Sequence, residues 1–287
     1  MKYGDPHQVC EAPVPDGISH MGSGGSKPGN IRRHDIHYSR PIAQCKDGEK
    51  RLQISFLIFD GVTALDFIGP AMALSRSMFD VQFVAKDEQP VYDDNGLGLL
   101  PTATFADIQH TDILCVPGTA NPYVQLKKTG MIDWVSRVGE SATWVTSVCT
   151  GSLILGAAGL LKGYKATSHW AMIDDLAYFG ATPTHERVVQ DRNRITGGGI
   201  TSGIDFGLTL LGLLKGASVA CSTQLSLEYD PLPPFDTGSP RTAPVDLVVK
   251  EKENFHEWLK VVAPDRLMLL EASARKLGLT MPQRGKI

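Results

Sequence analysis

The residue pattern alternates between short apolar runs and longer segments with helical spacing. The segment 125–139 has helical spacing, with Met131, Trp134, Val135 and Val138 on one face. The short runs are typical of strands buried on both faces of a sheet, and they are LQISFLIF (52–59), FDVQFVA (79–85), DILCV (112–116) and TWVTSV (143–148). This alternation predicts an α/β fold whose mostly parallel sheet carries helices on both faces.

Four further elements follow from turn signals. Residues 60–77 predict a helix that begins near Pro70, and residues 172–180 predict a helix that ends at Gly180. Residues 185–199 indicate a hairpin with its tip at 191–193, and residues 202–216 a helix with small residues suited to close packing.

Cys149 lies where the run TWVTSV turns into the helical run GSLILGAAGLL. A residue at such a strand-to-helix turn is pushed out of the sheet edge, which is the layout of a nucleophile elbow. We therefore expect an exposed thiol, and we expect the N-terminus of the following helix to lower its pKa. A buried structural cysteine is the alternative.

Two other positions fall at the same sheet edge. Gly118 follows the strand DILCVP, and Asp66 follows the first strand, so the N–H groups of Gly118 and Thr150 and the Asp66 carboxyl are candidates to surround Cys149. Gly118 could instead serve only the turn, and Asp66 could cap the helix near Pro70.

His169, in KATSHW, is the candidate imidazole, with a structural histidine as the alternative. The run TGGGITSG lacks the spacing of a phosphate-binding loop, so a tight strand-to-helix turn is the better interpretation. Cys115 lies inside an apolar strand and is expected to be inert core, and Cys221 is expected to serve packing.

Composition narrows the possible functions. The chain has 287 residues, of which 42% are hydrophobic, enough for one large α/β domain or two small ones. Its net charge of −3 gives no electrostatic basis for nucleic-acid binding. The five cysteines are widely spaced and form no C-x-x-C pair, which argues against disulfides and metal and favours the reducing cytoplasm. No apolar run reaches the roughly 20 residues that a membrane span needs.

Three regions differ in character. Residues 1–50 are rich in Gly, Pro, Ser and His and predict a flexible extension, within which Met21 is a conceivable internal start. Residues 51–244 carry the predicted α/β domain. Residues 245–287 predict a helical extension with eight basic and six acidic side chains, too balanced for holding a DNA duplex.

Several motifs together resemble one family. SVCTGSLILGAAGLLKG, KATSHW, HERVV, ITGGGITSGIDFGLTL and LSLEYDPLPPFDTGSP resemble the PfpI/ThiJ-type branch of the class I glutamine amidotransferase-like superfamily, over residues 52–244. Within it, the chain looks most like the members that hydrate isonitriles. The resemblance implies a flavodoxin-like α/β sandwich, a homodimer, and cofactor-free, metal-free conversion of an isonitrile to an N-substituted formamide by a hydro-lyase.

The resemblance also implies roles for individual residues. Cys149 matches the nucleophile and Asp66 the acid/base partner, Thr150 and Gly118 match the oxyanion side, and Ile200 matches the wall of the active site. The chain departs from the family in two places. Thr150 stands where protease-like members carry His, which speaks against peptidase activity. Thr119 stands where related hydratases carry Gly, which alters the oxyanion and substrate loop.

Two other functions remain open. The same architecture forms the ligand domain of AraC-type transcription regulators, so the chain could be a small-molecule sensor without a complete DNA-binding module. A glyoxal- or damage-handling relative of the same superfamily is the third possibility.

Overall fold

The computed structural model describes residues 51–75 and 78–280. The expected extension at 1–50, with Met21, Cys10 and Cys45, lies outside the described residues, and the three-region division stays a prediction. The strands are β1 (Gln53–Leu57), β2 (Asp80–Ala85), β3 (Val91–Tyr92), β4 (Gly98–Leu99), β5 (Ala103–Thr104), β6 (Ile113–Val116), β7 (Trp144–Val148), β8 (Lys165–Ala166), β9 (Thr182–Pro183), β10 (Val188–Asp191) and β11 (Arg194–Gly197).

The helices follow the strands along the chain. They are α1 (Leu65–Ala73), α2 (Pro122–Leu126), α3 (Thr129–Ser141), α4 (Gly151–Ala157), the 3₁₀ helix η2 (Ile173–Phe179), α5 (Ser202–Lys215), α6 (Ala217–Ser226), α7 (Val245–Val262) and α8 (Arg266–Lys276). None of the helices in the described ranges is long and apolar enough to cross a membrane.

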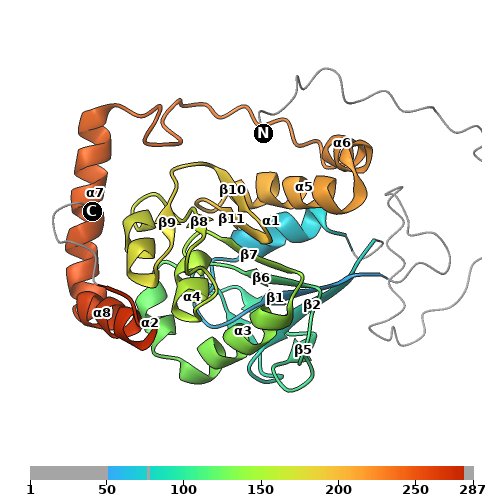
Figure 1. The fold of residues 1–287 in the computed structure, drawn as a ribbon. Coiled ribbons are helices and arrows are strands. Elements are labelled where there is room, and N and C mark those ends of the chain that lie inside the picture. Colours follow the sequence, from blue (N-terminus) through green and yellow to red (C-terminus); the bar gives the residue numbers. More distant parts are fainter. Residues whose placement is uncertain (1–50, 76–77, 281–287) are drawn as a thin grey trace, which may run out of the picture.

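A seven-stranded sheet forms the centre of the molecule, in the order β10-β11-β7-β6-β1-β2-β5. All its neighbouring strands pair in parallel except β10 with β11, which form the expected antiparallel hairpin. Helices α1, α5 and α6 lie on one face and α2, α3 and α4 on the other (Figure 1). This confirms the predicted flavodoxin-like α/β sandwich with helices on both faces.

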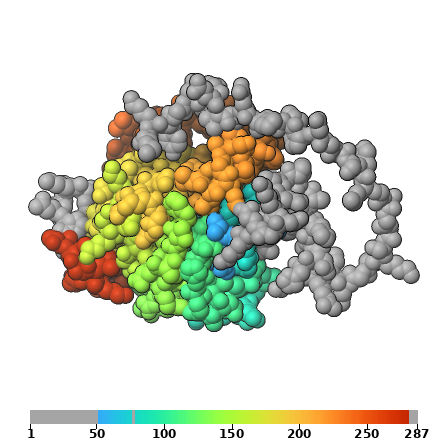
Figure 2. All heavy atoms as spheres, turned by 45° about the vertical axis from the view of Figure 1, so that its right-hand side comes forward, coloured from blue at the N-terminus to red at the C-terminus, as the bar shows by residue number. Residues whose placement is uncertain are grey.

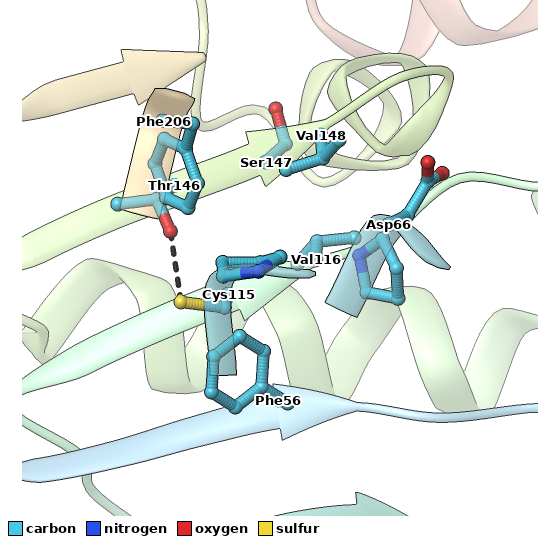
Figure 3. Close-up of a pocket in the computed structure, with 10 residues that line it drawn as sticks. Phe56, Asp66, Cys115, Val116, Thr146, Ser147, Val148 and Phe206 are labelled. Atoms are coloured by element: carbon cyan, nitrogen blue, oxygen red, sulfur yellow. Dashed lines mark hydrogen bonds between the residues drawn. The ribbon is translucent and has the colours of Figure 1, made fainter. Parts of the chain in front are cut away.

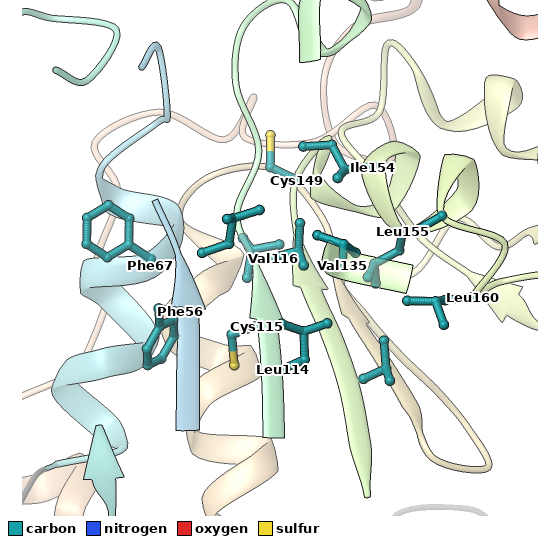
Figure 4. Packing of buried hydrophobic residues seen from close by; sticks show 14 of the residues in the cluster. Phe56, Phe67, Leu114, Cys115, Val116, Val135, Cys149, Ile154, Leu155 and Leu160 are labelled. Carbon is teal, nitrogen blue, oxygen red and sulfur yellow. The ribbon is translucent and has the colours of Figure 1, made fainter. Parts of the chain in front are cut away.

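The central strands are buried as their apolar runs require. Every residue of β6 is buried, and so are four of the five residues in β1 and in β7. On α3, Met131, Trp134, Val135 and Val138 form the buried face that the spacing predicts. These side chains join one continuous hydrophobic core (Figure 4).

Two helices differ in the structure from what the sequence predicts, one in where it begins and the other in its type. Helix α1 begins at Leu65, so Pro70 lies inside it and not near its start. Residues 173–179 form a 3₁₀ helix, which Gly180 ends with a left-handed φ of 71°. The strands β3 and β4 form a small antiparallel hairpin, while β5 joins the main sheet beside β2.

Helix α1 packs closely against α5 because glycines remove side chains from the contact. A Cβ added to Gly207 would come within 2.8 Å of Pro70 Cα, and one added to Gly203 within 3.1 Å of Pro70 Cδ. This contact places the start of α1, which carries Asp66, beside the turn that precedes α5.

The C-terminal segment of the described residues forms the helices α7 and α8. Helix α8 docks on η2 and α2 through Arg266, whose Nε lies 3.0 Å from Asp175 Oδ2 and donates to the Tyr123 hydroxyl at 2.9 Å. Asp175 is buried, so this ion pair is screened little by solvent. Lys127 and Asp265 form a second ion pair of 2.7 Å at the same contact.

Candidate active site

Cys149 occupies a sharp turn directly after β7 and before α4. Its φ is 57°, a left-handed conformation that few residues other than glycine adopt. Its N–H donates to the carbonyls of Gly197 at 3.1 Å and Gly198 at 2.8 Å, which hold the strained backbone. A Cβ on Gly151 would lie 2.0 Å from Val116 O, so the turn also depends on glycine there. The strand-to-helix elbow is therefore confirmed.

The environment of Cys149 differs from the expected one. The sulfur points beyond the carboxyl ends of the strands (Figure 4), yet the residue is only 4% exposed. Burial raises the pKa of the Cys149 thiol and the Asp66 charge raises it further, while the backbone N–H groups of Ile200 and Thr150 lower it. The expectation of an exposed thiol with a lowered pKa was wrong, because loss of hydration outweighs the two N–H groups.

Asp66 lies in the first turn of α1 and is 1% exposed. Its Oδ2 accepts the N–H of Gly118 at 2.8 Å, and its Oδ1 is buried with no hydrogen-bond partner among the described residues. Burial raises the pKa of Asp66 to about 7, against the opposing effects of Gly118 and Cys149. The side chain makes no capping hydrogen bond, so the alternative interpretation as a helix cap was wrong.

Gly118 serves Asp66 and not the nucleophile. The expectation that its N–H faces Cys149 was wrong, because that N–H is donated to the Asp66 carboxylate. A Cβ on Gly118 would lie 2.6 Å from both Thr150 N and Thr150 Oγ1 and 2.9 Å from Asp66 Oδ2. Glycine is therefore required here for close approach as well as for the turn.

The two threonines hold the loop after β6 against the elbow. Thr150 Oγ1 accepts the N–H of Thr119 at 2.9 Å and donates to Thr119 O at 2.7 Å. Both residues are buried. The Thr150 side chain thus orients the loop, while its backbone N–H is directed to the thiol.

Ile200 provides the second N–H that stabilises negative charge on the Cys149 sulfur. Its φ is 30°, which is unusual for a β-branched residue, and its side chain is 39% exposed. Residue pattern alone did not assign the backbone of Ile200 to the nucleophile. The glycines at 197–199 were the only signal, because they mark a turn that packs against another backbone.

His169 lies against the turn that precedes α5. Its ring packs against Gly199 and lies 6.1 Å from the Phe255 ring, and burial lowers its pKa. The neighbouring Ser168 hydroxyl donates to Cys149 O at 3.1 Å. Its position agrees with a packed structural histidine that borders the elbow.

A narrow gap lies beneath the site between the sheet and α1 and α5, and Asp66, Ser147 and Phe206 line it (Figure 3). Cys115 also lines it and is buried, with Thr146 Oγ1 donating to its sulfur at 3.1 Å. Burial raises the pKa of Cys115 to about 12, which agrees with inert core. Cys221 lies within α6 and is half-buried.

No group of three or more His, Cys, Asp or Glu side chains is arranged to hold a metal ion within residues 51–75 and 78–280. The chemistry that the arrangement offers is a buried thiol paired with a carboxyl of raised pKa. Two backbone N–H groups face the sulfur.

Comparison with known proteins identifies the family. Residues 52–213 match the model of the DJ-1/PfpI family, which is more than half of the chain. The chain belongs to the DJ-1/PfpI family. The fold agrees with a crystal structure of a ThiJ/PfpI family protein from Pseudomonas syringae, with a TM-score of 0.71 and 41% identity over 82% of this chain and 98% of that one.

Two curated relatives bear on function. Isonitrile hydratase from Pseudomonas putida is 48% identical over 230 residues, which span 79% of this chain and 99% of the relative. The HTH-type transcriptional regulator CdhR from Pseudomonas aeruginosa is 27% identical over 173 residues, and this chain spans about half of its length.

Proposed function

We propose that this member of the DJ-1/PfpI family is a hydro-lyase that converts an isonitrile to an N-substituted formamide without a cofactor. The observation that carries this proposal is the buried pair of Cys149 and Asp66 at the elbow, in a chain 48% identical to isonitrile hydratase over nearly all of that enzyme. The terminal carbon of an isonitrile becomes electrophilic when it is protonated, so its hydration needs a nucleophile and an adjacent proton donor.

Transfer of a single proton from Cys149 to Asp66 can supply both the nucleophile and the proton donor. Because the pKa of the thiol is raised and that of Asp66 is about 7, the pair above about pH 7 holds one proton, on sulfur, beside a carboxylate. Asp66 accepts this proton as the sulfur approaches the substrate, and it then delivers the proton to the terminal carbon. The C–S bond forms, and the product of this step is the thioimidate R–N=CH–S–Cys149.

Hydrolysis returns the site to its starting state. The Asp66 carboxylate takes a proton from water, the resulting hydroxide attacks the thioimidate carbon, and Asp66 passes that same proton to the nitrogen. Collapse of the tetrahedral adduct breaks the C–S bond, releases R–NH–CHO and leaves the proton shared between Cys149 and Asp66. The N–H groups of Thr150 and Ile200 stabilise the charge on sulfur as it attacks and as it leaves.

The position of each group supports these roles. Gly118 holds the Asp66 carboxylate in place with its N–H, while the second carboxylate oxygen has no other partner in the described structure and is free to move a proton. Thr119 and Thr150 fix the loop that carries Gly118. Ile200 and His169 border the elbow, where they would contact the substituent of the substrate.

The direct test is detection of formamide after incubation of the purified protein with cyclohexyl isonitrile. We expect one N-cyclohexylformamide per isonitrile consumed, with no added metal or cofactor. A protein that folds and alkylates normally but yields no formamide from alicyclic or aromatic isonitriles would contradict the proposal. We also propose a homodimer, and residence in a reducing compartment such as the cytoplasm, since the five cysteines of the sequence are widely spaced and form no C-x-x-C pair.

A further inference from the structure

The turn between β11 and α5 is held in a conformation that it would not adopt by itself. Gly198 and Gly199 leave the backbone free to rotate, and Ile200 follows with a φ of 30°. Rotation of the peptide between Gly199 and Ile200 would relieve the strain and would turn the Ile200 N–H away from Cys149. Contacts around the turn must therefore hold it in place.

Arg187 contacts both ends of this turn. Its carbonyl accepts the N–H of Gly198 at 2.9 Å, on the side of β11. Its guanidinium donates to Asp205 Oδ2 through Nε at 2.8 Å and lies 2.6 Å from the same oxygen through Nη2, on the side of α5. Residue 187 precedes β10, so one residue links the hairpin to the helix across the strained segment.

Asp205 receives a second contact from outside the sheet. The Tyr229 hydroxyl, in the chain that follows α6, donates to Asp205 Oδ2 at 2.9 Å. Asp205 lies in the first turn of α5, where a carboxylate also interacts favourably with the helix N-terminus. Residues near 190 and residues of α5 form adjoining parts of one face of the molecule (Figure 2).

The remainder of α5 cannot take up a displacement of the turn. Gly203 and Gly207 hold it against Pro70 of α1 at close approach, and the Cys149 N–H donates to the carbonyls of Gly197 and Gly198. Residues 199–201 lie between Gly198, which the Arg187 carbonyl holds, and the start of α5, where the carbonyls of Gly199 and Ile200 accept the N–H groups of Ser202 and Gly203 at 3.1 Å each. A change at Arg187 or Asp205 would act on the backbone that faces the sulfur.

We propose that Arg187 and Asp205 are positioning residues that hold the strained Ile200 turn so that its N–H faces Cys149. Both side chains act through the backbone of residues 198–201 and not through the sulfur itself. The inference rests on the proposed role of Cys149 as the nucleophile. It adds the residues outside the site that keep that nucleophile reactive.

The test measures how fast iodoacetamide alkylates Cys149 as a function of pH, by mass spectrometry of the Cys149 peptide. In Arg187→Met and Asp205→Asn we expect the alkylation profile to move to higher pH by about 0.5 to 1 unit, because one N–H is lost from the thiolate. Arg187→Lys should recover part of the shift. Asp66 and His169, the titratable neighbours of the elbow, are unchanged in all variants, so the shift reports on the turn.

Turnover of an isonitrile provides the second measurement. We expect kcat to fall about tenfold with KM within about twofold, less than the 10²–10³ that loss of a complete oxyanion donor costs. The matched control is Arg241→Met, which removes the neighbouring ion pair of Arg241 with Glu186 (3.2 Å) and should leave both measurements unchanged.

The outcomes separate the inference from the proposed function. Alkylation profiles of folded Arg187→Met and Asp205→Asn that coincide with wild type would overturn the inference, whatever their melting temperatures. If those variants do not fold, Tyr229→Phe removes one hydrogen bond from Asp205, and it must give a smaller shift in the same direction or the inference fails. If wild type hydrates no isonitrile, the proposed function fails while the alkylation experiment still decides the inference.

Discussion

Replacement of Asp66 by Asn should stabilise the protein at alkaline pH while abolishing its activity. The carboxyl is 1% exposed, and burial raises its pKa from an ordinary 3.8 to about 7. Between these two values the folded protein holds a proton that the unfolded chain has lost, so the stability of wild type falls as pH rises across this window. Above pH 7 the full free-energy cost of burying the ionised carboxylate is present, and it amounts to about 4 kcal/mol.

Asn carries no charge and keeps an oxygen that can accept the N–H of Gly118. Its added amide donors cost about 1–3 kcal/mol if they stay unpaired, at any pH. The difference in unfolding free energy between Asp66→Asn and wild type should therefore be small near pH 5. It should grow in favour of the variant by about 3 kcal/mol by pH 8.

Urea unfolding of both proteins at pH 5, 6.5 and 8 measures this difference. Asp80→Asn, a change at an exposed aspartate on the same sheet, is the control for the loss of a carboxylate at the surface. A difference for Asp66→Asn that is flat across the range, or that grows in favour of wild type, would refute the reasoning that burial dominates at this carboxyl.

Five further outcomes are expected. In isonitrile hydration, kcat/KM should fall as pH drops through about 7, because a protonated Asp66 cannot accept the thiol proton; a rate that is flat from pH 5 to 8 would contradict this. Cys149→Ala should lose turnover and stay folded by circular dichroism, whereas retained activity would exclude the thioimidate. Gly118→Ala should cost at least about 10²-fold in kcat, because its Cβ would meet Thr150 N at 2.6 Å. Sedimentation should give a dimer at micromolar concentration, and detection of the 31.1 kDa monomer alone would count against this expectation. A gel-shift assay near 0.15 M salt should show no specific DNA retention, and a sequence-selective shift would contradict that expectation.

The architecture could be predicted from sequence because its signals are local. Continuous apolar runs at 52–59 and 112–116 require strands covered on both faces, and the spacing of Met131, Trp134, Val135 and Val138 sets one face of α3. The abrupt change from an apolar run to Gly151 placed the elbow at Cys149. These features depend on neighbours in the chain, so the order of residues is sufficient to reveal them.

Only the tertiary structure decided the electrostatics of the site. The pKa of Cys149 depends on how completely α1, the loop after β6 and the turn before α5 exclude water, and no local pattern encodes this exclusion. The same holds for Gly118, whose N–H faces Asp66 because helix α1 begins at Leu65, five residues before Pro70. Residue types therefore identified the candidate groups. Which N–H donates to which atom was decided by contacts between segments that are distant in sequence, because hydrogen bonds and the loss of hydration depend on which segments the fold brings together.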